Sequence, residues 1–269
     1  MSKQDDDNND HNTRPKGFAK TLLDDAHKTG TLSAASMQAL DVVDMGAQIQ
    51  AGLGVAVDDV TASEVVLVTM MPDDSNSIAW AKNTAAVRDG HNLVLEALKK
   101  SRQAGEVFTH CRYLNGDVLY PYVPLDGAVE MDANNYDPCH GTPLYDQTVV
   151  LLGTVVAKSA ELAQAGVPVR TVTLLITDGG DYGSTRCGPK EVRALVQDML
   201  AQENHVIAAM GIHDGTTDFM KVFRDMGIPD RWILTPRNSP TEIRKAFQVF
   251  SQSAVAVSAG AAFVGGFGN

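Results

Sequence analysis

The sequence predicts an α/β fold in which a doubly wound, Rossmann-like and mostly parallel sheet carries helices on both faces. Two observations lead to this prediction. The apolar runs VVLVTMM, TVTLLIT and HVIAAMGI are continuous rather than alternating, as expected of strands that are buried on both faces. Stretches with helical periodicity separate these runs, and helices of that length join parallel strands by crossing over a face of the sheet.

The predicted elements alternate along the chain from residue 65 onward. Strands are expected at 65–71, 107–113, 118–123, 170–177, 205–212 and 231–235. Helices are expected at 78–102, 143–165, 189–202, 217–226 and 240–257, and a long loop leads from the strand at 118–123 to Gly141. A chain of 269 residues can bury a substantial core, so we expect residues 61–258 to form one domain.

The N-terminal part of the chain differs from this pattern. Residues 1–16 are rich in Asp and Asn and almost free of apolar side chains, which predicts a disordered acidic tail. Residues 17–60 are expected to form a helical extension packed on the domain. An apolar stripe at helical spacing supports this expectation, and its members are Met37, Leu40, Val43 and Ala47.

The C-terminal residues 259–269, AGAAFVGGFGN, form a Gly-rich tail. Three apolar side chains stand among the glycines: Phe263, Val264 and Phe267. The sequence leaves open whether these side chains pack on the domain or contact a partner.

Composition limits the class of protein. An apolar fraction of 44% with 20% charged residues is ordinary for a soluble globular protein, and no apolar stretch is long enough to span a bilayer. The first residues lack the apolar segment of a secretory signal, so we expect a cytoplasmic protein. The net charge of −11 argues against nucleic acid as a partner. The three cysteines are few and widely spaced, and we expect free thiols.

Polar side chains follow two of the predicted strands. Asp73, Ser75 and Ser77 follow the strand at 65–71, and Asp178 follows the strand at 170–177. Ligands bind a doubly wound sheet beyond the carboxyl ends of its strands, so both loops are expected to face one crevice. Neither GxGxxG after a strand nor GxxxxGK[ST] occurs in the sequence, which removes the two common nucleotide-binding loops.

The spacing in the first loop suggests a cation site. Asp73, Ser75 and Ser77 stand two residues apart, so in an extended stretch their side chains point the same way. Oxygen-only donors that include a carboxylate suit Mg²⁺, whereas zinc prefers nitrogen and sulfur. Mn²⁺ and Ca²⁺ are the alternative ions.

Three pieces of the sequence together resemble the von Willebrand factor A (vWA) domain. They are Asp73-x-Ser75-x-Ser77 after a buried strand, a Thr in the stretch 141–146 (GTPLYD), and Thr177-Asp178-Gly179 at the end of another strand. The order and placement of the three pieces match the family, and the resemblance covers roughly residues 62–257. It implies a vWA-like fold for the domain at 61–258.

The resemblance also implies a metal-ion-dependent adhesion site. In that scheme the hydroxyls of Ser75, Ser77 and Thr142 ligate the ion directly, and Asp73 and Asp178 hold it directly or through water. Family members often carry Gly between the two serines, whereas this chain has Asn76. Asn tolerates left-handed backbone better than other non-glycine residues, so we expect the loop to keep its shape.

The implied function is a Mg²⁺-dependent protein-binding module, for adhesion or scaffolding, and not an enzyme. A cation surrounded mainly by neutral hydroxyls and water keeps much of its charge, so it attracts an acidic side chain. A partner protein that offers an Asp or Glu is therefore expected. Bacterial relatives of this kind often act beside ring-forming ATPases, which makes such an ATPase or an assembly subunit a candidate partner.

Other interpretations remain open from the sequence. A metal-dependent phosphatase or hydrolase would use Asp73 as nucleophile, but haloacid-dehalogenase-like phosphatases carry a second Asp where this chain has Ser75. A structural assembly subunit would use the metal only to hold loops. Taken singly, the loop residues at 73–77 and Thr142 could simply cap helices. The pair Cys139-His140 suggests zinc only weakly, because no second pair lies nearby.

Overall fold

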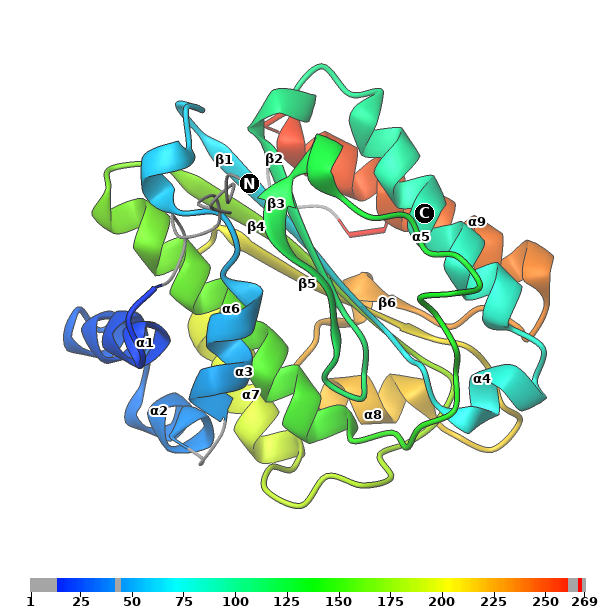
Figure 1. The fold of residues 1–269 in the computed structure, drawn as a ribbon. Helices are drawn as coiled ribbons and strands as arrows, with labels where there is room; N and C mark the ends of the chain where they lie inside the picture. The colour runs from blue at the N-terminus through cyan, green and yellow to red at the C-terminus, as the bar shows by residue number, and fades with distance from the viewer. Residues whose placement is uncertain (1–13, 42–44, 261–265, 268–269) are drawn as a thin grey trace, which may run out of the picture.

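The sheet has the strand order β3-β2-β1-β4-β5-β6 (Figure 1). The computed structural model describes residues 14–41, 45–260 and 266–267. In these ranges the strands are β1 (Val65–Pro72), β2 (Val107–Arg112), β3 (Val118–Pro124), β4 (Val169–Thr177), β5 (His205–Gly211) and β6 (Ile233–Leu234). Only β2 and β3 pair antiparallel, and the other neighbours are parallel. The predicted mostly parallel sheet is therefore confirmed.

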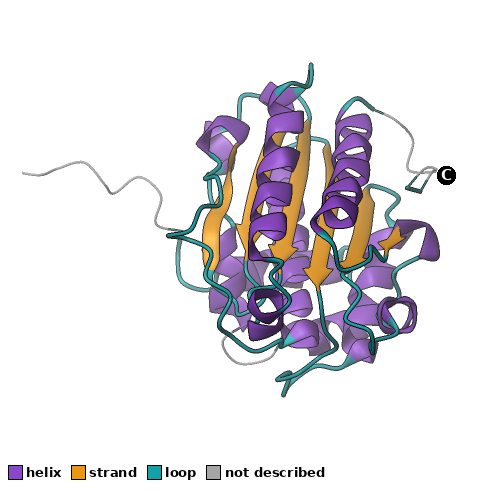
Figure 2. Ribbon diagram, turned by 90° about the vertical axis from the view of Figure 1, so that its right-hand side faces the viewer, coloured by secondary structure: helices purple, strands orange, loops and turns teal. Residues whose placement is uncertain are grey.

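Helices cover both faces of the sheet, as predicted (Figures 1 and 2). The helices are α1 (Phe18–Lys28), α2 (Ala34–Leu40), α3 (Met45–Gly52), α4 (Asn76–Trp80), α5 (Thr84–Lys99), α6 (Leu144–Gln164), α7 (Pro189–Ala201), α8 (Phe219–Asp225) and α9 (Pro240–Ser258). The pair α5 and α9 packs on one face, whereas α6 and α7 pack on the other and carry α1 and α2 outside them. The helix α3 packs against both α6 and β3.

The core lies between these layers and explains the continuous apolar runs. Every residue of β1 and of β5 is buried, as both-face burial requires. On the α5–α9 face the two helices approach closely at Gly90. A Cβ atom there would lie 2.1 Å from the ring of Phe247, so only glycine permits this contact.

The prediction of a single helix at 78–102 is wrong, because the chain forms α4 and α5 there instead. The break lies at Lys82, whose φ of 61° is left-handed. The Asn83 N–H donates to the carbonyl of Ile78 at 2.9 Å, which closes α4 in the way that a C-terminal glycine usually does. Because lysine occupies the left-handed position, the sequence carries no sign of the break.

The predicted stripe in residues 17–60 is also wrong in detail. The extension forms three helices, and α1 and α3 pack against α6 while α2 packs against α7. Ala47 is exposed, and Val43 lies outside the described residues. Leu40 is buried as expected, together with Ile49 and Leu53.

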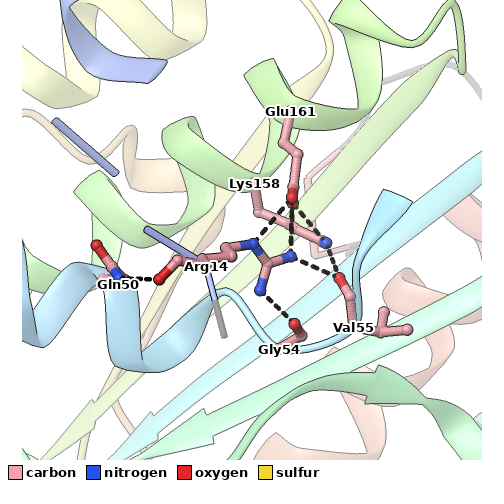
Figure 3. A network of polar contacts seen from close by, with 6 residues as sticks. All are labelled: Arg14, Gln50, Gly54, Val55, Lys158 and Glu161. Carbon is pink, nitrogen blue, oxygen red and sulfur yellow. Dashed lines mark hydrogen bonds and ion pairs between the residues drawn. The ribbon is translucent and has the colours of Figure 1, made fainter. Parts of the chain in front are cut away.

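Arg14, which the sequence placed in the acidic tail, is held against α6 instead (Figure 3). Its Nη2 lies 2.8 Å from Glu161 Oε1 and 2.8 Å from the carbonyl of Val55, and its Nη1 donates to the carbonyl of Gly54. The fully buried Lys158 donates to the other oxygen of Glu161 at 2.7 Å. We call this cluster the α6 ion network. The remaining predicted tail, 1–13, lies outside the described residues.

The C-terminal residues that the structure describes contact the domain. The Phe267 ring meets Trp232 edge-on, with centroids 5.2 Å apart, and its N–H donates to Arg231 O at 2.9 Å. Phe263 and Val264 lie outside the described residues. The strand predicted at 231–235 shortens to β6, because Asp230–Trp232 form a 3-10 turn. In the described ranges no helix has the length and apolar character needed to cross a bilayer.

Candidate metal site

The two polar loops meet at the carboxyl ends of the neighbouring strands β1 and β4. A chain of hydrogen bonds joins them: Ser75 Oγ lies 2.8 Å from Ser77 Oγ, and Ser77 Oγ donates to Asp178 Oδ1 at 2.5 Å. The structure therefore brings Ser75, Ser77 and Asp178 together, as expected from the position of both loops after adjacent parallel strands.

Asp73 lies directly beneath this chain of hydroxyls and is fully buried. Its Oδ1 accepts the N–H of Ser75 at 2.7 Å, and its Oδ2 accepts the hydroxyl of Thr177 at 2.7 Å. The hydroxyl of Tyr136 donates to its backbone carbonyl. Asp73 thus connects the loop after β1 to the end of β4 and fixes the orientation of both.

The hydroxyls converge for a different reason from the one that the spacing suggested. The extended backbone ends at Ser75, with ψ of 161°, and Ser77 already lies in the first turn of α4. The chain therefore turns into the helix instead of alternating as a strand. In the described residues the only non-glycine residues with positive φ are Lys82 and Glu203, so Asn76 is not left-handed and its special tolerance is not used.

Helix capping does not account for the hydroxyls at this site. Ser75 is the N-cap residue of α4, but its side chain accepts no capping hydrogen bond. The N-cap of α6 is Pro143, and the N–H groups of Tyr145 and Asp146 in its first turn donate to Ser184 Oγ, at 3.0 and 3.1 Å, and not to Thr142. Ser75 and Thr142 are therefore available for another role.

Thr142 reaches the site on a third loop, which backbone hydrogen bonds fix in place. The N–H of His140 donates to Asp74 O at 3.1 Å, and the N–H of Asn76 donates to His140 O at 3.1 Å. Thr142 and Tyr182 exchange two backbone hydrogen bonds, of 3.0 and 2.8 Å. Thr142 is 6% exposed, and in the described part of the chain no hydrogen bond joins its hydroxyl to the other four predicted ligands.

Buried carboxylates dominate the electrostatics of the site. Burial raises the pKa of Asp178 to about 6 and also raises the pKa of Asp73. Among the described residues, neither carboxylate forms an ion pair with a Lys or Arg. A divalent cation would supply the missing positive charge, and the oxygen donors present suit a hard ion. The residues therefore fit the ion that the sequence predicts.

The structure offers no site of the zinc type in the described ranges. Cys139 Sγ lies 3.5 Å from His140 Nε2, which in turn lies 3.8 Å from Asp74 Oδ2. No group of three or more His, Cys, Asp or Glu side chains within those ranges is placed to hold a metal ion. A cation at this edge of the sheet would therefore need serine or threonine hydroxyls among its ligands.

Two residues of the site were not selected from the sequence. Thr177, whose hydroxyl orients Asp73, is the residue before Asp178 in the motif Thr177-Asp178-Gly179. Its position at the end of a predicted strand was the sequence signal that could have identified it. Tyr136, which holds the backbone of Asp73, comes from the long loop before Gly141 and has no sequence signal.

The fold aligns with solved structures of other proteins. The pilus adhesin SpaC from Lactobacillus rhamnosus GG aligns in its open conformation with a TM-score of 0.50 and 15% identity, over 73% of this chain and 30% of that one. A second SpaC form gives a TM-score of 0.51 and 14% identity, over 73% and 31%. The VWA domain of SpRpn10 aligns with a TM-score of 0.47 and 12% identity, over 71% and 96%.

The alignment with SpaC includes less than a third of that protein, and its low identity makes it a likeness of fold alone. The sequence matches no family model and no curated protein. The strand order, with one antiparallel pair at the β3 edge and helices on both faces, agrees with this likeness. The chain has the fold of a von Willebrand factor A domain.

Proposed function

We propose that this chain is a protein-binding module that depends on a divalent cation, with Mg²⁺ as the preferred ion. The observation that carries the proposal is the hydrogen-bonded chain from Ser75 through Ser77 to Asp178, above the buried carboxylate of Asp73. Hydroxyls and carboxylates are oxygen donors of the kind that Mg²⁺ takes. Thr142 would add a further hydroxyl from the third loop.

Each residue has a separate task in this proposal. Ser75, Ser77 and Thr142 offer neutral oxygens, whereas Asp178 offers a charged one. Asp73 positions the loop, because both of its oxygens already accept hydrogen bonds from neighbouring groups. A cation bound there would supply a positive charge that neutral donors compensate only in part, and so would attract an Asp or Glu of a partner protein.

The alternative of phosphoryl transfer through Asp73 finds less support. A nucleophile must reach its substrate, whereas Asp73 is fully buried and both of its carboxylate oxygens are engaged. Ser75 also stands where the phosphatase pattern has an acid. For a role in adhesion or scaffolding, the proposed partner is a ring-forming ATPase or an assembly subunit.

The first test compares two adjacent carboxylates. We expect Asp73→Ala to abolish the thermal stabilisation that Mg²⁺ gives, which amounts to about 2.7 kcal/mol at 100 times the dissociation constant. Asp74→Ala should keep it, because Asp74 faces the other way and accepts the N–H of Asn115 at 3.0 Å. Equal responses of the two variants to Mg²⁺ would contradict the proposed site.

The second arm of the test addresses the partner. Affinity purification from the native cell, with and without a chelator, should recover a protein only when the divalent ion is present. A partner whose recovery is insensitive to the chelator, on a chain that Mg²⁺ nevertheless stabilises, would favour the structural role of the metal.

A further inference from the structure

A cavity of about 220 Å³ lies beside the candidate metal site, on the side of β2. Its lining includes the carboxylates of Asp74, Asp117 and Asp137 and the rings of Tyr113 and Tyr136. We call this cavity the acidic pocket. Among its lining residues, all of which the structure describes, there is no Lys or Arg, so the cavity favours a cation.

We propose that the acidic pocket receives an arginine side chain of the same protein partner whose carboxylate binds at the metal site. The inference rests on the proposed function and deepens it, because it states the chemistry of the partner. The partner segment would carry an Asp or Glu and, close to it, an Arg.

The first argument is a carboxylate oxygen at the pocket wall that accepts no hydrogen bond from another described residue. Asp74 is 3% exposed and lines the pocket. Its Oδ1 accepts the N–H of Asn115, whereas its Oδ2 accepts no hydrogen bond from any described residue and faces His140 Nε2 only at 3.8 Å. Carboxylate oxygens are strong acceptors, so Oδ2 can take a further donor from a ligand that enters the pocket.

The second argument distinguishes an organic cation from a metal ion. No group of three His, Cys, Asp or Glu side chains in the described ranges is close enough to share one ion. A guanidinium group spreads five N–H donors over a rigid plane, and so can reach carboxylates that stand apart. The rings of Tyr113 and Tyr136 are 7% and 2% exposed, with centroids 5.5 Å apart, so they bound the pocket without offering an open face for stacking.

The third argument is continuity with the metal site. Asp73 and Asp74 are adjacent, and they serve the metal site and the acidic pocket respectively. His140, which lines the pocket, is fixed to the loop after β1 by two backbone hydrogen bonds, one to Asp74 O and one from Asn76 N–H, at 3.1 Å each. A single partner segment can therefore occupy both, with the acid and the Arg only a few residues apart.

The experiment is a selection from a displayed random-peptide library on the full chain in Mg²⁺, with elution by chelator. We expect the eluted peptides to carry an Asp or Glu and an Arg at a fixed spacing. Replacing that Arg by Ala should weaken binding to the native chain about tenfold, as expected for loss of a charge-assisted contact. Affinity is measured by fluorescence anisotropy of the labelled peptide.

The variant Asp117→Asn/Asp137→Asn tests the pocket itself, because both side chains are exposed and asparagine keeps a side-chain oxygen at each position. It should bind the selected peptide about tenfold more weakly, keep the Mg²⁺ dependence, and show no further loss with the Arg→Ala peptide. The matched control Asp89→Asn/Asp126→Asn removes two exposed charges elsewhere, and should bind like the native chain.

Three outcomes would overturn the inference: eluted peptides with the acid but without Arg, no peptide binder of either kind, or an Arg→Ala loss that is equal in the native chain and the pocket variant. The proposed function fails in a different way. Arg-bearing peptides that stay bound through the chelator step, are recovered by a subsequent acid elution and bind the native chain equally well with chelator would support the pocket and contradict cation-dependent binding.

Discussion

The α6 ion network and the candidate metal site bury charge in opposite ways. In the network, the carboxylate of Glu161 meets two cations, Arg14 and Lys158, at 2.8 and 2.7 Å (Figure 3). At the metal site, Asp73 and Asp178 are buried without an ion pair to any described Lys or Arg. The chain completes the first cluster by itself and leaves the second one incomplete.

The difference shows how burial separates a structural cluster from a binding site. Removing a charge from water costs several kcal/mol unless a partner charge offsets the cost. In the α6 ion network, positive side chains of the chain itself offset this cost, and the ion pairs tie the N-terminal segment to α6. At the candidate metal site no described Lys or Arg offsets this cost, and burial raises the pKa of Asp178 to about 6.

The largest effect is expected from breaking the network. Glu161→Ala leaves the fully buried Lys158 without a carboxylate, which should lower the free energy of unfolding by about 3–5 kcal/mol. Urea unfolding followed by circular dichroism measures the change. The control is Glu96→Ala, which removes an exposed helical ion pair with Lys100 and should change the free energy of unfolding far less. Similar losses of unfolding free energy in the two variants would contradict the expected difference between buried and exposed ion pairs.

The second prediction concerns Asp178→Asn, whose effect on the free energy of unfolding should have opposite signs with and without metal. In chelator, Asp178→Asn removes a buried charge that has no counter-ion, so the free energy of unfolding should rise, on the order of 1 kcal/mol after allowance for solvent screening. In Mg²⁺ the variant should gain no stabilisation, whereas the native chain does. A variant that is less stable in chelator would show that the site already balances its own charge.

The smallest effect concerns pH. The pKa of Asp178 is higher in the folded state than in the unfolded state. Without metal, protonation of this carboxylate therefore stabilises the folded state progressively as pH falls through about 6. Mg²⁺ needs the ionised form, so the Mg²⁺-induced rise in melting temperature should fall to roughly half or less between pH 7.5 and pH 5.

Buried histidines act over the same pH range and must be separated from this effect. Burial lowers the pKa of His91 and of His205 to about 4, so their contribution is lost as pH falls below about 6.5. That loss is the same with and without Mg²⁺, and it cancels in the difference between the two melting temperatures. A difference that stays constant from pH 7.5 to pH 5 would contradict a role for the carboxylates.

The parts of the fold that the sequence predicted are those with local causes. The strands were predictable because burial on both faces leaves continuous apolar runs, and the polar loops because they follow such runs directly. The break at Lys82 was not, because a lysine holds the left-handed position that glycine usually marks. Arg14 was assigned to a tail because its partner Glu161 lies 147 residues away in the sequence.

The candidate site was predictable in its residues and less so in its geometry. Asp73, Ser75, Ser77 and Asp178 were selected because the ends of adjacent parallel strands meet, and the structure joins them by hydrogen bonds. Whether they ligate a metal stays a prediction. The acidic pocket was not predicted, since its lining comes from separate segments that share neither spacing nor periodicity.

The hydrogen bond between Ser77 and Asp178 spans 101 residues of sequence, and this separation has a consequence for biogenesis. A nascent chain that has emerged only as far as α6 contains two of the three loops and cannot form this hydrogen bond. The bond can form only when β4 pairs with β1, which is a long-range step. Unfinished or truncated chains therefore lack the complete candidate site, which depends on a complete central sheet.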